Sequence, residues 1–254
     1  MQTHKTPSVS ILLPTYNEAD NIVLLIEALR TCMKGIVTQI LVIDDASPDG
    51  TAQIVRDAIA GNHWKNVSVL ERKIDRGLTN SIRDGIASTT GEIVVWMDCD
   101  FSHPPELVPV LVSEVCGGKD ACVASRFAPH GKQKTAGGMH GDSTTAIGLS
   151  TALNMFLKIL FRFDFHDYTS GFIAIRRNVL ETLPLRGDYG EYFIDLMCRF
   201  FFAGHTVSEI PFESPPRRSG QSKTGSDPIT LLRHGASYFA TVFRVIVEHG
   251  IGKI

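Results

Sequence analysis

Short apolar runs alternate with segments of helical periodicity through the first half of the chain. Such runs are typical of strands buried on both faces, and helices between them indicate a parallel sheet. The predicted strands are Val9–Leu13, Ile40–Ile43, Val67–Leu70, Ile93–Met97 and Ala121–Ala124. The predicted helices are Glu18–Cys32, Gly50–Ala60, Thr79–Ser88 and Glu106–Cys116. We therefore expect an α/β fold whose mostly parallel sheet has helices on both faces.

The second half of the chain is less regular. Residues 126–148 are rich in glycine and basic residues and lack periodicity, which indicates a mobile lid or a disordered connection. We favour the lid because the segment begins at the carboxyl end of a strand. Helices are predicted at Ala146–Phe161 and Glu191–Ala203, extended segments at Phe172–Ile175 and Val207–Phe212, and a second polar loop at Glu213–Asp227.

The last predicted element is an amphipathic helix over Pro228–His249. Arg233 and Arg244 lie eleven residues apart and so point in nearly the same direction. The helix packs on the rest of the chain in one interpretation, and contacts a membrane surface or another subunit in the other. Its apolar stripe, with intervals of three and four, consists of Ile229, Leu232, Ala236, Phe239, Phe243 and Ile246.

Length and composition narrow the class of protein. The 254 residues suffice for one large α/β domain, and 43% hydrophobic content is ordinary for a globular protein. A net charge of −2 argues against a nucleic-acid binder. The five cysteines form no C-x-x-C pair, which indicates reduced thiols, and neither a signal region nor an apolar run of about 18 residues is present. We expect a cytoplasmic protein that could work at the cytosolic membrane surface.

Two acidic residues one position apart, Asp98 and Asp100, directly follow the predicted strand Ile93–Met97. Carboxylates at the end of a buried strand suit Mg²⁺ or Mn²⁺, which keeps coordination positions open for substrate phosphates. Polar residues also follow two other strands, at Pro14–Glu18 and Asp44–Gly50, and ligands bind at this edge of such sheets. An isolated Asp-x-Asp can also be a solvated acidic turn, but in this company the pair indicates an enzyme that handles a diphosphate.

Seven motifs occur along the chain in a set order. They are Pro-Thr-Tyr-Asn-Glu at 14–18, Asp-Asp-Ala-Ser-Pro-Asp-Gly-Thr at 44–51, Arg-Gly-Leu at 76–78, Asp-Cys-Asp-Phe-Ser-His-Pro-Pro-Glu at 98–106, Ser-Arg-Phe at 125–127, Asp-Tyr-Thr-Ser-Gly-Phe at 167–172 and Arg-Arg-Ser-Gly-Gln-Ser-Lys at 217–223. Over about residues 8–245 the chain resembles family-2 inverting glycosyltransferases, especially dolichol- or polyprenyl-phosphate mannose synthases and their glucose-transferring relatives. The resemblance implies a Rossmann-like GT-A fold, with a catalytic domain at 1–226 and the C-terminal amphipathic helix at 227–254.

The resemblance also implies a GDP- or UDP-hexose donor. Tyr16 can stack on a nucleobase or pack over the ribose. Glu18 can accept hydrogen bonds from the donor, or can simply be a charge in the first turn of a helix. At least one of Asp44 and Asp45 would contact the nucleoside. The implied donor-binding residues are Pro14, Tyr16, Glu18, Asp44, Asp45, Asp98 and Ser102.

Asp98 and Asp100 would hold the Mg²⁺ or Mn²⁺ that bridges the donor diphosphate. Asp100 is the expected direct ligand, while Asp98 could act on the ribose or through water. His103 is expected to cap local backbone, because no zinc ligand set surrounds it. Asp49 and Gly50 read as a turn and helix start, and we do not count them as site residues.

The acceptor can be inferred from acid–base chemistry. A hydroxyl acceptor needs a general base, whereas a phosphate monoester, with a second pKa of about 6, is mostly a dianion and needs only cations to position it. Arg126, Arg217 and Lys223 fit that need, or are surface charges. The resemblance implies that Arg126 and Arg217 contact phosphate and that Ser150 lies in the acceptor region. The expected acceptor is a polyprenyl phosphate at the membrane surface.

One departure from the resembled family concerns residues 137–146. The polyprenyl-phosphate synthases usually carry a Trp and then an Arg shortly before the position of Ser150, and this chain has neither. Lys132, Lys134 or His140 could substitute for the arginine, or the acceptor differs.

Two other functions stay open beside transfer to a lipid phosphate. The same donor chemistry could serve a hydroxyl acceptor on a glycan, small molecule or peptide, with Asp195 or Glu191 as base. Alternatively, the chain is an inactive scaffold subunit that binds a nucleotide sugar and recruits a partner through its last helix. A dinucleotide dehydrogenase is disfavoured, because Pro14–Glu18 replaces a glycine-rich phosphate loop. A membrane partner subunit or a homo-oligomer is compatible with each alternative.

Overall fold

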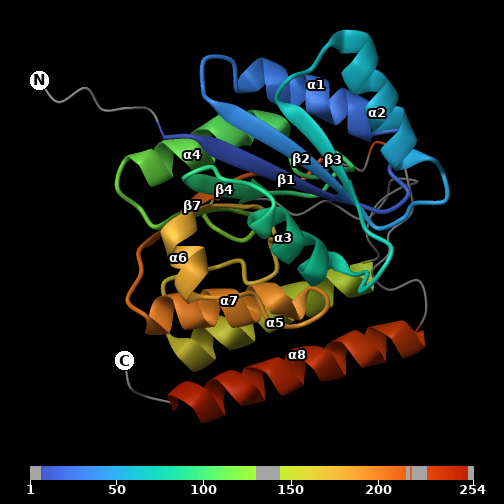
Figure 1. Cartoon of the computed structure of the whole chain (residues 1–254). Coiled ribbons are helices and arrows are strands. Elements are labelled where there is room, and N and C mark those ends of the chain that lie inside the picture. The colour runs from blue at the N-terminus through green and yellow to red at the C-terminus, as the bar shows by residue number, and fades with distance from the viewer. Residues whose placement is uncertain (1–6, 130–143, 216–217, 219–227, 251–254) are drawn as a thin grey trace, which may run out of the picture.

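A seven-stranded sheet with the spatial order β3-β2-β1-β4-β6-β5-β7 forms the centre of the molecule (Figure 1). The computed structural model describes residues 7–129, 144–215, 218 and 228–250. Only β6 runs antiparallel to its neighbours, β4 and β5, so the predicted mostly parallel sheet is confirmed. The strands are β1 (Val9–Thr15), β2 (Thr38–Asp44), β3 (Val67–Glu71), β4 (Ile93–Trp96), β5 (Ala121–Ser125), β6 (Ile173–Arg176) and β7 (Val207–Pro211).

Helices follow most of the strands. Among the described residues, no helix combines the length and the apolar character that crossing a bilayer requires. A 3₁₀ turn at Pro105–Leu107 precedes α4. The α-helices in the described ranges are α1 (Ile22–Cys32), α2 (Thr51–Asn62), α3 (Leu78–Ala87), α4 (Val108–Cys116), α5 (Thr144–Phe161), α6 (Arg177–Thr182), α7 (Glu191–Phe202) and α8 (Pro228–His249).

Alternate side chains of the strands enter two separate cores, one on each face of the sheet. In β1, Ile11 and Leu13 join the core formed with α1, α2 and α4. Leu12, between them, joins the core formed with α3, α5, α7 and α8. Figure 1 shows these two groups of helices on opposite sides of the sheet, so the predicted helices on both faces are confirmed.

Three predicted boundaries differ from the structure. Helix α1 begins at Ile22 rather than at Glu18, because residues 18–21 form a turn in which the Asn21 side chain donates to Glu18 Oε2 at 2.9 Å. Helix α5 begins at Thr144, so residues 144–148 of the expected loop are helical, while residues 130–143 lie outside the described part. The six-residue helix α6 was missed, because it is too short to show periodicity.

Helix α8 packs on the protein, but not through the face that the sequence predicts. Val242 and Val245 are buried in the core shared with α7. Phe239 and Phe243, which belong to the predicted stripe, are 69% and 68% exposed. The side chains of residues 228–234, including Ile229, Leu232 and Arg233, lie outside the description. The predicted stripe is therefore wrong at its two aromatic positions.

A polar contact sets the rotation of α8. The guanidinium of Arg244 donates from Nη2 to Oδ1 of Asp195 on α7 at 3.0 Å, and Asp195 is completely buried. Because α8 is apolar on two sides, intervals of three and four fit more than one face of it. The ion pair with α7, which is a long-range contact, decides which face turns inward.

Candidate functional site

The carboxyl ends of β1, β2 and β4 meet at one edge of the sheet. Thr15, at the end of β1, pairs in register with Asp44, and the Asp45 N–H donates to the Thr15 carbonyl at 3.0 Å. After β4, the Cys99 thiol contacts the Pro14 carbonyl at 3.5 Å. The structure thus brings together the three polar segments that follow these strands in the sequence.

The two acidic residues after β4 have different surroundings. The side chain of Asp98 is 54% exposed, whereas Asp100 is 3% exposed and its Oδ1 accepts from the Ser102 N–H at 2.9 Å. Phe101, between Asp100 and Ser102, has a left-handed φ of 65° and turns the chain there. The backbone therefore holds Asp100 in place, while Asp98 is open to solvent.

The segment after β7 lies across this turn. The Arg218 N–H donates to the Asp100 carbonyl at 3.0 Å, and the Ser214 hydroxyl donates to the Ser102 carbonyl at 3.1 Å. Arg217 and Lys223, two of the predicted phosphate-binding residues, lie outside the described residues, as do Lys132, Lys134 and His140. The position of Arg218 nevertheless brings this polar loop of the sequence to Asp100.

His103 connects the acidic turn to the core. Its ring stacks on Phe172, with 4.8 Å between ring centroids, and Nδ1 accepts from the Asp98 N–H at 3.0 Å. Burial lowers the pKa of His103, so its ring is neutral and carries its proton on Nε2, 3.9 Å from Asp98 Oδ2. The backbone cap predicted for His103 is confirmed.

Asp44 is buried and organises the loop that follows β2. Its carboxylate accepts from the Thr15 hydroxyl at 3.2 Å and from the Ser47 N–H at 2.9 Å. Further along, Asp49 accepts from the Thr51 N–H at 3.0 Å and Gly50 has a φ of 82°, which confirms the turn and helix start expected there. A nucleoside contact of Asp44 remains a prediction.

Asp45 belongs to a buried cluster that the sequence did not reveal. Its carboxylate forms an ion pair with Arg72 at 2.5 Å and accepts from the Gly77 N–H at 2.7 Å and the Ser81 hydroxyl at 3.0 Å. Arg72 also pairs with Asp84 at 2.6 Å, and these carboxylates raise its pKa despite the opposing effect of burial. Asp45 therefore ties the end of β2 to the turn before α3.

Tyr16 and Glu18 follow β1 at the same edge. The Arg76 guanidinium lies over the Tyr16 ring, 5.2 Å from its centroid. The backbone N–H of Glu18 donates to the Thr51 hydroxyl at 3.0 Å, which joins this segment to the loop after β2. Both side chains are partly exposed, as are the edge positions around Pro14, so donor binding stays possible as predicted.

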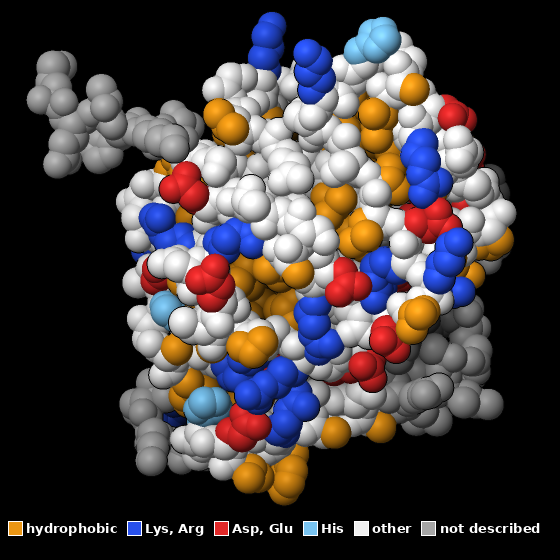
Figure 2. Space-filling model, viewed as in Figure 1, with side chains coloured by type: hydrophobic (Ala, Val, Ile, Leu, Met, Phe, Trp, Pro, Cys, Tyr) orange, Lys and Arg blue, Asp and Glu red, His pale blue; other side chains and the backbone are white. Residues whose placement is uncertain are grey.

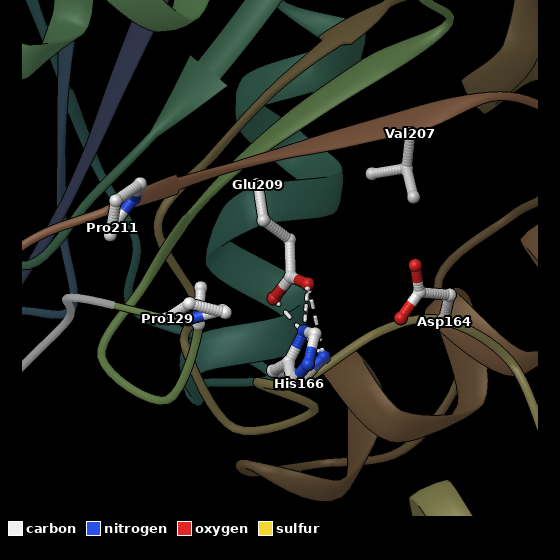
Figure 3. A pocket seen from close by; sticks show the side chains of 7 residues that line it. Pro129, Asp164, His166, Val207, Glu209 and Pro211 are labelled. Atoms are coloured by element: carbon white, nitrogen blue, oxygen red, sulfur yellow. Dashed lines mark hydrogen bonds and ion pairs between the residues drawn. The ribbon is translucent and has the colours of Figure 1, made fainter.

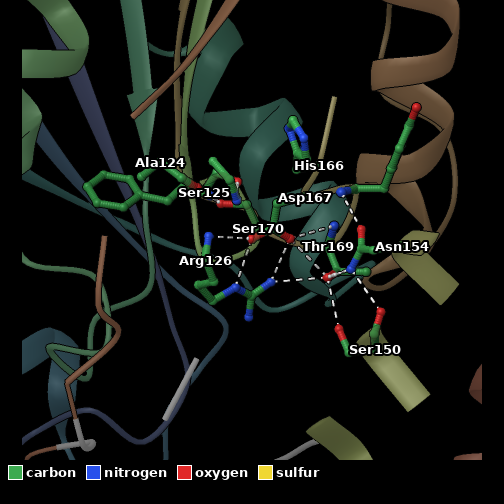
Figure 4. Close-up of polar contacts among 12 residues, drawn as sticks. Ala124, Ser125, Arg126, Ser150, Asn154, His166, Asp167, Thr169 and Ser170 are labelled. Atoms are coloured by element: carbon green, nitrogen blue, oxygen red, sulfur yellow. Dashed lines mark hydrogen bonds and ion pairs between the residues drawn. The ribbon is translucent and has the colours of Figure 1, made fainter. Parts of the chain in front are cut away.

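A second polar cluster follows β5 (Figure 4). Arg126 donates to both carboxylate oxygens of Asp167, from Nε and from Nη2, each at 2.9 Å. Its Nη2 also donates to the Thr169 hydroxyl at 3.0 Å, and Thr169 contacts the Ser150 hydroxyl of α5 at 3.1 Å. Asn154, one turn after Ser150, donates to both Thr169 and the Ser150 carbonyl. Arg126 and Ser150, predicted separately, are thus joined through Thr169.

An open pocket of about 350 Å³ lies beside this cluster (Figure 3). Glu209 of β7 accepts from the His166 N–H at 3.1 Å, and its Oε2 lies 2.7 Å from the ring Nδ1. Lys158 of α5 lies 2.5 Å from the other ring nitrogen. These contacts hold His166, and with it the adjacent Asp167, between the edge strand and α5.

The two residues considered as general bases do not reach this edge. Asp195 is completely buried and pairs with Arg199 at 2.6 Å as well as with Arg244. Glu191 is also buried, and its carboxylate accepts from the Asp188 N–H at 3.0 Å. The structure contradicts Asp195 as a base, because its charge is taken up by two arginines of the fold.

The acidic pair fits a metal ion that shares its coordination with a substrate. Within the described ranges, no cluster of three or more His, Cys, Asp or Glu side chains is placed to hold a metal ion. Mg²⁺ commonly binds through one or two carboxylates plus substrate phosphates, and Asp98 and Asp100 supply such a set. The donor atoms are oxygens, as Mg²⁺ and Mn²⁺ prefer.

Two groups of relatives match this chain. Residues 10–183 match the model of glycosyl transferase family 2. The chain is 29% identical over 227 residues to "Dolichol-phosphate mannosyltransferase" of Pyrococcus furiosus, covering 89% of this chain and 62% of that protein. It is 31% identical over 230 residues to "Polyprenol monophosphomannose synthase" of Mycolicibacterium smegmatis, covering 88% of this chain and 83% of that protein. The chain thus spans less than two thirds of the length of the Pyrococcus relative.

Solved structures agree on the fold. Glucosyl-3-phosphoglycerate synthase from Mycobacterium tuberculosis, in complex with Mn²⁺, UDP-glucose and phosphoglyceric acid, has a TM-score of 0.70 and 21% identity over 94% of this chain and 79% of that one. The same enzyme with Mn²⁺, UDP and glucosyl-3-phosphoglycerate has a TM-score of 0.68 and 20% identity over 97% and 81%. The predicted GT-A fold is confirmed, and the family match over most of the chain shows that this protein belongs to glycosyl transferase family 2.

Proposed function

We propose that the chain transfers a hexose, with inversion, from a GDP- or UDP-sugar to a polyprenyl phosphate at the membrane surface, using Mg²⁺ or Mn²⁺. The observation that carries the proposal is the position of His103, whose electrostatic neighbours include Asp98 and Asp100 on one side and Arg126 and Asp167 on the other. A candidate diphosphate site and a candidate phosphate site therefore border one buried ring.

The relatives support both halves of the proposal. The names of the two sequence relatives specify mannosyl transfer involving dolichol phosphate or a polyprenol monophosphate. A structural neighbour binds Mn²⁺ together with UDP-glucose. These names leave the base and the hexose of this chain open between GDP-mannose and a UDP-hexose.

The donor half of the site would act on the departing diphosphate. A metal ion bound at Asp98 and Asp100 would act as a Lewis acid on the negative charge that develops there. Asp100 suits direct ligation because Ser102 fixes its carboxylate. The proton on Nε2 of neutral His103 faces Asp98 and so helps to orient this more exposed carboxylate.

The acceptor half would position a phosphate that is already nucleophilic. An oxygen of the acceptor phosphate would bond to the anomeric carbon from the face opposite the diphosphate, while the bond between that carbon and the diphosphate breaks. No proton has to be removed from a phosphate dianion, which agrees with the burial of Asp195. Arg126 and the Ser150 hydroxyl, joined through Thr169, would hold the phosphate, and Arg217 would add a second cation.

Label transfer tests the proposed function. The purified protein is incubated with Mn²⁺ and radiolabelled GDP-mannose, UDP-glucose or UDP-N-acetylglucosamine, with and without a short-chain polyprenyl phosphate. We expect label in the lipid extract with one of these donors, only when the polyprenyl phosphate is present, and none after addition of EDTA. Label on added sugars or peptides would instead support a hydroxyl acceptor. Donor binding without any transfer would support a scaffold subunit.

Replacement of Arg126 tests the acceptor half. Lysine keeps the charge but cannot form the bidentate contact with Asp167, so Arg126→Lys should lower kcat/KM for the polyprenyl phosphate by about 10- to 100-fold. The KM for the donor should change little. The matched control is Arg176→Lys, because Arg176 donates to main-chain carbonyls, including that of Lys119, near the opposite edge of the sheet. Equal acceptor kinetics in both variants would exclude a phosphate contact of Arg126.

A further inference from the structure

The outward side of α8 is apolar. Every exposed residue between Ala236 and Val247 is apolar, and Phe239, Phe243 and Val247 are each more than two thirds exposed. The inward side of the same helix is apolar as well, at Val242 and Val245. A helix on a water-facing surface ordinarily carries polar residues on its outer side, so this side is suited to contact something other than water.

Helix α5 has the same character. Its exposed residues Met155 and Ile159 are 65% and 66% exposed, and Phe156 between them is 45% exposed. Leu157 and Phe161 fill the core on the inner side. The spacing of three and four gives a continuous outer stripe. We name the two stripes together the α5–α8 apolar face; it consists of Leu149, Ala152, Met155, Phe156, Ile159, Ala236, Phe239, Ala240, Phe243 and Val247.

The two stripes belong to one side of the molecule. Phe202, at the end of α7, contacts Phe161 of α5 edge-to-face at 6.1 Å and stacks on His249 of α8 at 4.5 Å. The carboxyl-terminal ends of α5 and α8 therefore meet at the same point of α7. Figure 1 shows both helices on the side of α7 away from the sheet, and Figure 2 shows hydrophobic side chains at the surface along that lower edge.

The face is continuous with the proposed acceptor cluster. Ser150, which contacts Thr169, lies on α5 among the exposed apolar residues of that helix. Ile159, near the other end of the stripe, is nine residues away, or about 13 Å along the helix axis. One rigid helix therefore carries both a side chain of the phosphate cluster and the outward apolar stripe.

We propose that the α5–α8 apolar face docks on the surface of a phospholipid bilayer, with its apolar side chains at the boundary between headgroups and acyl chains. This inference rests on the proposed function, because a polyprenyl phosphate keeps its hydrocarbon chain in the bilayer while its phosphate stands at the surface. Docking through α5 brings Ser150 to that depth. Covering the face with a second copy of the chain would hold the bilayer away from the acceptor cluster.

Charged residues on the same helix suit this occupant. Lys158 is 41% exposed, and Arg162 is exposed directly after the end of α5. Long basic side chains next to an apolar stripe extend toward headgroup phosphates while their methylene groups stay on the apolar side. Basic residues in this position add electrostatic attraction when the bilayer contains anionic lipids.

Vesicle sedimentation without donor or acceptor tests the docking. Wild-type protein should pellet with vesicles of phosphatidylcholine and phosphatidylglycerol, and the double variant Phe239→Ser, Phe243→Ser should partition at least about tenfold more weakly. The matched control is Val37→Ser, since Val37 is 69% exposed but lies between α1 and β2. It should pellet as the wild type does. Because all three substituted residues face solvent, circular dichroism and thermal unfolding should be unchanged.

Three results would overturn the docking proposal. They are wild-type protein that stays in the supernatant, a double variant that pellets like the wild type, and a wild-type dimer in sedimentation velocity that the double variant dissolves. The proposed function is tested separately with a water-soluble short-chain polyprenyl phosphate. With that acceptor the double variant should keep wild-type turnover, whereas with the acceptor embedded in vesicles its rate should fall at least about tenfold, following the weaker partitioning. Absence of transfer by the wild type would refute the function and leave the sedimentation result valid.

Discussion

Asp100→Asn is expected to lower kcat/KM for sugar transfer by roughly a thousandfold, because an amide is a poor ligand for Mg²⁺ or Mn²⁺ and a loss of charge stabilisation at the diphosphate affects the transition state directly. The replacement is nearly isosteric. Its Oδ1 can still accept from the Ser102 N–H, so the turn around Phe101 should keep its shape. Initial rates of label transfer, measured over a range of Mn²⁺ concentrations, give the size of the effect.

Two further measurements isolate the role of Asp100. The control is Asp57→Asn, since Asp57 is an exposed residue of α2 that accepts only from the nearby Gln53 side chain at 2.8 Å among its recorded contacts. This variant should transfer at the wild-type rate. Thermal unfolding of Asp100→Asn should match that of the wild type. Wild-type turnover by Asp100→Asn would show that the metal has been assigned to the wrong carboxylates.

Asp195→Ala is expected to lower the free energy of unfolding by about 3–5 kcal/mol, because it leaves a buried guanidinium without a counter-charge. The side chain of Arg199 is 5% exposed and donates from Nε to Asp195 at 2.7 Å. Its remaining recorded contact, from Nη2 to the Pro184 carbonyl at 2.7 Å, does not neutralise the charge. Urea unfolding, extrapolated linearly to zero denaturant, measures the change.

The half-exposed partner provides the contrast. The Arg244 side chain is 40% exposed, so Arg244→Ala should cost no more than about 1 kcal/mol of unfolding free energy. Equal losses in Asp195→Ala and Arg244→Ala would contradict the dominant role of the buried Arg199 pair. Since Arg244 sets the rotation of α8, the Arg244→Ala variant should also bind vesicles more weakly than the wild type.

The strands and their order of parallel pairing were predictable from local pattern. In β1, Ile11 and Leu13 enter one core while Leu12 enters the other, and a run that is apolar at all three positions is compatible only with burial on both faces. The antiparallel direction of β6 was not predictable, because the four residues Ile173–Arg176 can pair in either direction and the preceding connections decide between them.

The candidate site was predictable only in part. Asp98 and Asp100 are neighbours in sequence, so their place after a buried strand was enough to single them out. Arg72, by contrast, lies 27 residues from Asp45, and nothing near it in the chain marks it as an ion-pair partner. The pairing of Arg126 with Asp167 spans 41 residues. The motif at 167–172 was the available signal for Asp167 and Thr169, but it did not say what they contact.

The sequence by itself determined which segments become strands and helices, which strand ends carry acidic groups, and which family the motifs resemble. These properties follow from side-chain periodicity and from residues adjacent in the chain. Only the tertiary structure decided that Asp195 is a buried counter-ion rather than a base, and that Phe239 and Phe243 face outward. Both outcomes depend on which distant groups compete for the same buried charge, and that competition takes place only when α7 and α8 are packed together.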